Sequence, residues 1–152
     1  MRKVKTDVII SPSDIIVTTP KSEMENSARE AEDCIKTGFG TYFRYFPQKP
    51  KLIKVPFFLF YVEADYIRGF ALVANFVRTS SIKCHYRDRE WLKGWYALMW
   101  ANTWKWINPI PMKGFQGFRY FCQALPDIKK VEIIGGWKDP KPYVTWSQKW
   151  EK

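Results

Sequence analysis

The segment Trp91–Arg119 has the residue types that nucleic-acid-binding surfaces use, because aromatic rings alternate there with cationic side chains. Aromatic side chains stack on unpaired bases, at ~1–3 kcal/mol per base, while lysines and arginines hold the phosphates. Trp100, Trp104 and Trp106 have the same parity, so a regular strand would place them on one face. The alternative is that these large rings fill the core. The binding residues expected from this segment are Trp104, Trp106, Lys113 and Arg119.

The end of this segment, Ile107–Phe118, has the sequence INPIPMKGFQGF. It contains residues that restrict the backbone angles and others that leave them free. Its two prolines favour an extended approach, and Gly114 and Gly117 allow a turn with close access to the backbone. This pattern resembles the PIP-x-(K/R)-G-x-x-G-(L/F) segment of ASCH domains, which belong to the PUA-like superfamily together with EVE and YTH domains. The similarity continues upstream and covers about Asp7 to Phe121 in order.

Upstream, ASCH domains have a helix followed by a G-x-K-T-x-E-x-R signature, and the chain resembles it in part. Gly38 and Thr41 match, whereas Gly40 and Phe43 stand where the family has Lys and Glu. Some ASCH relatives are amidohydrolases that act on acetylated cytidine and use that Lys, Thr and Glu. Neither Gly40 nor Phe43 can exchange protons, so the chain is not expected to be an enzyme of that kind.

Members of this superfamily hold a base or a strand in a cleft beside the barrel. The resemblance implies that Thr41 and Tyr42 line this cleft, with Arg44 at its mouth holding a phosphate or a base edge. Arg68, next to Gly69, is a weaker candidate for the same role. For both arginines the alternative is a solvated side chain on a strand.

The charge of the chain also favours an anionic partner. Its 152 residues carry 25 Lys and Arg against 15 Asp and Glu, a formal net charge of +10. Nucleic acid is the first expectation for a surface of this kind. Because the apolar run Val55–Val62 is too short to cross a bilayer, no membrane association is expected.

Few residues are available for metal or thiol chemistry. The chain has one histidine, His85, and three widely spaced cysteines, Cys34, Cys84 and Cys122. The odd number and the absence of a CxxC pair argue against a disulfide framework and favour a reducing, cytoplasmic location. No metal or cofactor is expected.

The hydrophobic pattern predicts one mostly β domain of class α+β spanning residues 1–152, with one helix in its N-terminal half. Ser22 and Glu25 form a capping-box pair, and apolar residues recur at helical spacing up to Ile35. A further short helix is predicted to start at Asp88. The expected strands are Val4–Ile10, Ile15–Val17, Thr41–Phe46, Leu52–Val62, Ile67–Val77, Tyr96–Trp106 and Val131–Ile134. Many closely spaced strands favour a barrel, and the resemblance makes it PUA-like.

The sequence therefore predicts a non-catalytic module that binds nucleic acid, RNA rather than DNA, through an unpaired or modified base. Two alternatives stay open. One is a nucleoside or RNA hydrolase on the same fold, with Glu63, Asp65, Lys113 and Tyr42 as candidate acids and bases. The other is a protein-interaction module in which exposed aromatic residues form the contact.

Overall fold

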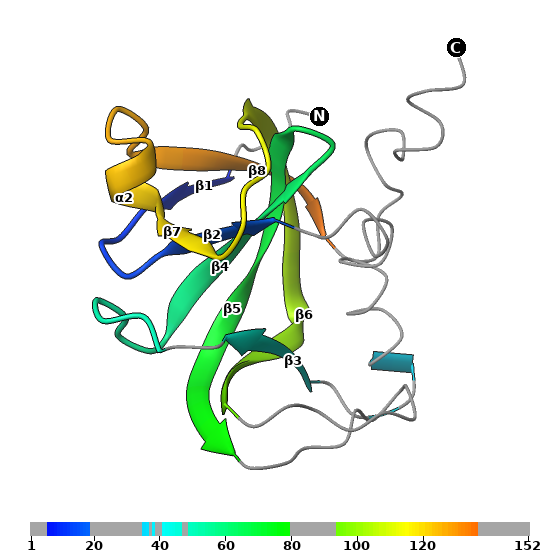
Figure 1. The fold of residues 1–152 in the computed structure, drawn as a ribbon. Helices are drawn as coiled ribbons and strands as arrows, with labels where there is room; N and C mark the ends of the chain where they lie inside the picture. The colour runs from blue at the N-terminus through cyan, green and yellow to red at the C-terminus, as the bar shows by residue number, and fades with distance from the viewer. Residues whose placement is uncertain are drawn as a thin grey trace.

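The computed structural model describes residues 6–18, 35–36, 38, 41–46, 49–79 and 94–136. These residues form a mostly β structure, a curled mixed sheet that makes a half-barrel (Figure 1). Its elements are β1 (Thr6–Ile9), β2 (Ile15–Thr18), β3 (Thr41–Phe46), β4 (Phe57–Glu63), β5 (Tyr66–Thr79), β6 (Gly94–Pro111), β7 (Phe118–Tyr120), α2 (Phe121–Ala124) and β8 (Lys130–Gly136).

The strand order is β1-β8-β6-β5-β4-β2-β7, and β3 pairs with β6 off this path. All pairings are antiparallel except that of β2 with β4. The 18-residue β6 is the longest strand and pairs with β3 along its first part, with β8 near its end and with β5 throughout. In Figure 1, β5 and β6 run between a lower end, where β3 lies, and an upper part that holds β1, β2, β7 and β8.

All seven expected strands are present in the expected order, and the structure adds an eighth, β7. Two boundaries were wrong: β6 continues to Pro111 instead of ending at Trp106, and β4 begins late. Leu52–Val62 was expected to be a single strand, but β4 begins only at Phe57, after a turn at Lys51 and Leu52. The reason is Pro56, which has no N–H to donate to a neighbouring strand. The three residues of β7 and the four of α2 follow directly on one another and were not expected.

The one short helix that the structure describes, α2, lies toward the C-terminus rather than in the N-terminal half. The helix expected from Ser22 lies outside the described residues, except that Ile35 and Lys36 are helical. The short helix expected at Asp88 also lies outside them.

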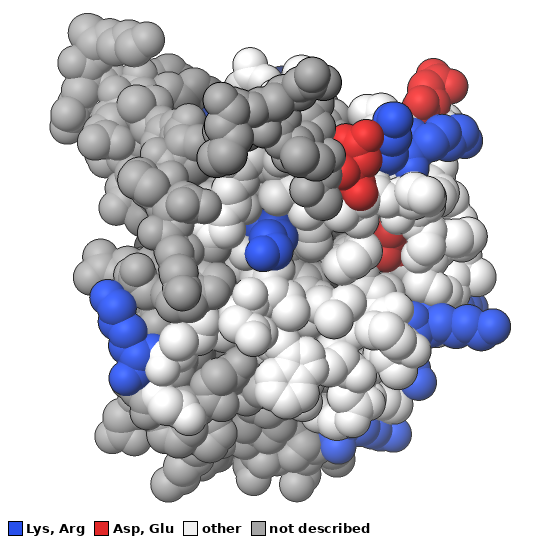
Figure 2. Space-filling model, turned by 180° about the vertical axis from the view of Figure 1, so that it is seen from behind, with Lys and Arg blue, Asp and Glu red and all other residues white. Residues whose placement is uncertain are grey.

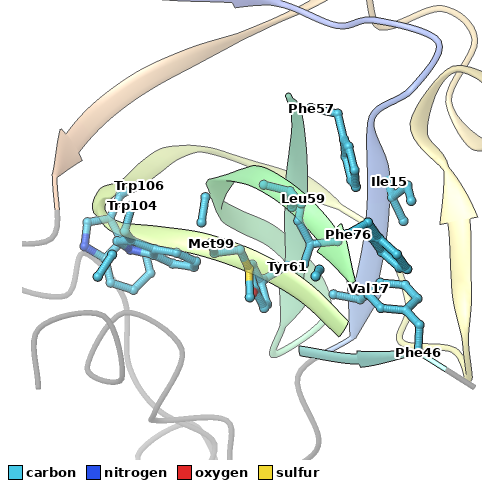
Figure 3. Packing of buried hydrophobic residues seen from close by; sticks show 14 residues of the cluster. Ile15, Val17, Phe46, Phe57, Leu59, Tyr61, Phe76, Met99, Trp104 and Trp106 are labelled. Atoms are coloured by element: carbon cyan, nitrogen blue, oxygen red, sulfur yellow. The ribbon is translucent and has the colours of Figure 1, made fainter. Parts of the chain in front are cut away.

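Apolar side chains are buried on both faces of the sheet. One cluster lies inside the curl and takes residues from β2, β3, β4, β5 and β6, among them Leu59, Met99 and Trp104 (Figure 3). The other includes Phe60, Phe70 and Phe121, and therefore joins the opposite face of β4 and β5 to α2. The alternation of β4 residues between the two clusters follows from the two-residue period of a strand.

Gly69 on β5 is required by the close approach of β6. A Cβ at this position would lie 2.6 Å from the Lys105 carbonyl oxygen and 2.7 Å from Cζ2 of Trp104. Both distances are shorter than any normal carbon contact, and neither the backbone oxygen nor the buried ring can move freely.

We therefore expect Gly69→Ala to lower the free energy of unfolding by about 1–3 kcal/mol, the usual cost of overpacking. Urea denaturation followed by circular dichroism measures this. Gly117→Ala is the reference for backbone strain without a clash, since its φ is +78° and no atom beyond its chain neighbours lies within 4 Å of the added carbon. A Gly69→Ala variant as stable as the wild type would contradict the close packing of β5 on β6.

Asp14 connects three elements from a buried position. Its two carboxylate oxygens accept hydrogen bonds from the backbone N–H groups of Ser11 (2.8 Å) and Phe58 (2.9 Å). Its carbonyl oxygen accepts one from the N–H of Phe121, the first residue of α2. Burial raises the pKa of the Asp14 carboxyl above its ordinary value of 3.8, although the hydrogen bonds oppose the shift.

Because the folded state holds this proton more tightly than the unfolded chain, the contribution of Asp14 to stability decreases as the pH rises from 3.8 through the folded-state pKa. In Asp14→Asn this part of the pH dependence should be absent. The difference in unfolding free energy, wild type minus variant, should therefore fall with rising pH in that window. Urea titrations at several pH values measure it, with the exposed Asp127→Asn as control; a pH-independent difference would be evidence against the shift.

Candidate functional site

The expectation that Trp100, Trp104 and Trp106 share one face is wrong. Trp100 is 46% exposed, whereas Trp104 and Trp106 are buried in the core cluster inside the curl. The cause is an irregularity in the β5–β6 ladder, because Leu72 pairs with Trp100 but Phe70 pairs with Lys105. The extra residues of β6 reverse the alternation of its side chains between the two faces of the sheet. At this place the Leu72 N–H donates to the Thr103 hydroxyl oxygen (2.9 Å) and not to a backbone carbonyl oxygen of β6.

Trp104 and Trp106 pack against each other and against β4. Their ring centroids are 5.4 Å apart with the planes at 89°, and the Trp104 ring lies 5.1 Å from that of Tyr61. Figure 3 shows the two indoles at one side of the cluster, with Met99 and Tyr61 next to them. In this conformation both rings are closed off from solvent, so an external base has no access to their faces.

Thr18, the last residue of β2, brings together segments from three parts of the chain. Its carbonyl oxygen accepts a hydrogen bond from Nη2 of Arg44 on β3 (3.3 Å). Its hydroxyl oxygen accepts the N–H of Phe115 (3.0 Å), in the loop between β6 and β7. Gly114 fits beside it, because a Cβ there would lie 3.0 Å from the Thr18 methyl group.

Two further cations belong to this region. The Arg119 guanidinium on β7 lies over the Phe115 ring, 4.4 Å from its centroid, and its side chain is exposed. Lys113 is exposed in the same loop, next to Gly114. We call the set Thr18, Arg44, Lys113, Phe115 and Arg119 the Thr18 junction. It combines three cations with an aromatic ring that is partly open to solvent.

The turn between β4 and β5 lies at the same end of the sheet. Thr18 pairs in parallel with Val62, so the buried Glu63 follows directly beyond it. The turn residues Ala64 and Asp65 have positive φ angles of 51° and 66°, and the Met112 N–H donates to the Asp65 carbonyl oxygen (3.0 Å). This bond connects the turn to the loop that carries Lys113.

Arg68 lies on β5 just after this turn. Its Nε donates to the Glu63 carbonyl oxygen (3.1 Å), and its guanidinium lies 4.7 Å from the centroid of the exposed Tyr66 ring. Partial burial lowers the pKa of Arg68, while the Glu63 carboxylate opposes the shift. The side chain stays a cation at neutral pH, because an arginine pKa remains far above 7.

The structure thus places Arg44 on Thr18, Arg119 on the Phe115 ring and Lys113 in the same loop as Phe115, with Arg68 on β5 just after the adjoining turn. It places Trp104 and Trp106 in the core. Thr41 and Tyr42 lie on β3 opposite Trp100 and Met99, and their side chains are outside the described residues. Of the four candidate acids and bases, Glu63 and Asp65 lie at the β4–β5 turn, and Lys113 lies in the loop that is bonded to this turn. The fourth, Tyr42, lies on β3.

Sequence reasoning missed Thr18, Tyr66 and Phe115. For Phe115 a signal was present, since it lies between two glycines beside Lys113. Thr18 offered none, because its importance depends on a contact with a residue 97 positions away.

Within the described ranges, no group of three or more His, Cys, Asp or Glu side chains is placed to hold a metal ion. No helix in that part of the chain is long and apolar enough to span a membrane. Comparison of the chain with protein-family models, with curated proteins and with solved structures found no match.

The hydroxyl of Thr18 should hold the β6–β7 loop in place. Thr18→Val removes the acceptor of the Phe115 N–H, and loss of one partly buried hydrogen bond costs about 1 kcal/mol. We expect faster hydrogen exchange at the Phe115 amide, measured by NMR, and a small loss of stability. Thr18→Ser keeps the hydroxyl and should leave the exchange rate near that of the wild type; equal rates in Thr18→Val and wild type would contradict the role of this bond.

Proposed function

We propose that the chain is a nucleic-acid-binding module that contacts a single strand, RNA in preference to DNA, at the Thr18 junction. The observation that carries the proposal is that Thr18 binds both Arg44 and the backbone of the β6–β7 loop, which carries Lys113 and the Phe115 ring under Arg119. Cations close to an aromatic face are the combination that binds phosphates and stacks a base. The net charge of +10 adds long-range attraction for a polyanion.

Exposed aromatic rings would supply the stacking surfaces in place of the buried tryptophans. Phe115 lies beneath Arg119, and Tyr66, 37% exposed, lies beside Arg68. An arginine that contacts an aromatic ring can also stack on a neighbouring base, because its guanidinium group is planar. The proposed contact surface therefore runs over the β6–β7 loop and the β4–β5 turn, which the Met112–Asp65 hydrogen bond links.

A relationship to the PUA-like superfamily, closest to ASCH domains, is part of the proposal. It is supported by the ordered motifs from Asp7 to Phe121 and by the curled mixed sheet. The segment matching the family's PIP-x-(K/R)-G pattern includes Lys113 and Gly114, which contribute to the Thr18 junction.

Isolated cations on the described surface suit this mode of binding. Figure 2 shows Lys and Arg side chains at separate places around a largely uncharged area of one face, with one in its middle. Such a face favours individual phosphate contacts along a strand over attraction to a single dense basic patch.

The test is fluorescence anisotropy with labelled single-stranded RNA, single-stranded DNA and duplex DNA at about 50 and about 200 mM salt. We expect the tightest binding to single-stranded RNA, weakening steeply with salt. Lys113→Ala and Arg119→Ala should each reduce the slope of log affinity against log salt by about 1, the value for one lost phosphate contact.

Lys129→Ala is the matched control, an exposed lysine just before β8 that should leave the slope unchanged. An affinity that does not change between the two salt concentrations would overturn the proposal. If the salt slopes of Lys113→Ala, Arg119→Ala and Lys129→Ala are equal, the nucleic acid does not bind at the Thr18 junction.

A further inference from the structure

Trp95, near the start of β6, is a half-buried tryptophan whose ring packs against residues of the core. In the sheet it lies between Phe46 on β3 and Arg78 on β5, its partners in register. Its ring is 6.0 Å from that of the buried Phe76, and it packs against the core cluster inside the curl. One part of the indole is therefore anchored in the core while another part is open to solvent.

Two cations lie against this one ring. Lys49 Nζ is 5.1 Å and the Arg78 guanidinium carbon is 5.9 Å from its centroid, and both side chains are exposed. Within the described part of the chain, no carboxylate forms an ion pair with either of them. Each cation–π contact is favourable on its own, but two like charges at one ring repel each other. An anion bound here would relieve that repulsion.

The Trp95 surface, made of Lys49, Arg78 and Trp95, shares no residue with the Thr18 junction. The two lie beside each other in the sheet, because Trp95 pairs with Phe46 while Arg44 of the junction pairs with Ala97, two residues away on the same two strands. Arg44 is half-buried and donates to the Thr18 carbonyl oxygen, whereas Lys49 and Arg78 are exposed at the Trp95 ring.

We propose that the Trp95 surface is a second contact for single-stranded nucleic acid, in which one base stacks on the indole while Lys49 and Arg78 neutralise the flanking phosphates. The ligand class rests on the proposed function, but none of the residues of the Thr18 junction takes part. An acidic protein segment could use the two cations, but it has no planar base to stack on the indole, and the open indole favours the nucleic acid.

The experiment uses the full chain with 5-fluorotryptophan at its eight tryptophan positions and follows ¹⁹F NMR spectra. Trp95→Phe, which keeps an aromatic ring against the core, assigns the Trp95 resonance. The probe is an oligouridylate of about 16 nucleotides, the upper end of the site size of one small β-barrel domain. We expect the Trp95 resonance to shift on titration, and Lys49→Ala and Arg78→Ala each to lower the salt slope by about 1.

Three outcomes overturn the inference. If the oligonucleotide binds and Lys113→Ala weakens it while the Trp95 resonance does not move, the second contact is wrong and the proposed function stands. If poly-glutamate produces the same shift as the oligonucleotide, the surface recognises negative charge without a base. If no salt-sensitive binding occurs, both proposals fail. If the Trp95 resonance shifts and Lys113→Ala does not weaken binding, the result supports the Trp95 surface and counts against the Thr18 junction.

Discussion

The antiparallel ladder between β5 and β6 contains more residues on β6 than on β5, and the half-barrel is arranged around this mismatch. Before it, the odd-numbered Ala97, Met99 and Ala101 face the inside of the curl; after it, the even-numbered Trp104 and Trp106 do. Gly69 makes the change possible, because any side chain there would collide with the Trp104 ring. The two largest side chains of the core therefore lie where the sheet curves, and β4 closes over them through Tyr61.

This arrangement gives the described aromatic residues different environments. Trp104, Trp106 and Phe60 are fully enclosed and stabilise the sheet by burying apolar area. Phe115, Tyr66 and Trp95 each lie partly open and next to a cation. Composition alone does not separate these two sets, since both occur among basic residues. Exposure separates them, because only the second set has ring surface open to solvent.

The sequence was sufficient to predict seven of the eight strands and their order, because β-branched and aromatic runs separated by proline and glycine are local signals. The three residues of β7 are too few to give such a signal. It was not sufficient for the facing of Trp100, because the irregularity in β6 arises from pairing with β5. The local sign of this irregularity is the pair Asn102 and Thr103, two polar residues between the buried Ala101 and Trp104. The start of β4 was mispredicted since apolar character alone does not distinguish a strand from the turn at Lys51.

For the candidate site, the sequence identified cations but not their neighbours. Arg44, Lys113 and Arg119 were all selected from motif and composition. The structure adds Thr18, a residue with no distinguishing context, which binds Arg44 and the loop that carries Lys113. Asp14 illustrates the same limit. Its place in a Ser-Pro-Ser-Asp turn is visible in the sequence, but its hydrogen bond to Phe58 joins residues 44 positions apart. Long-range partners of this kind follow from topology and not from local pattern.

The brevity of β7 has a consequence for how the molecule behaves in concentrated solution. As the last strand in the sheet order, it presents one side of its backbone without a further strand among the described residues. An open strand edge is a template on which another chain can add and start an aggregate. Here that edge is only three residues long, it carries the charged Arg119, and the chain turns at once into α2. A second molecule would find too few backbone groups in line to extend the sheet.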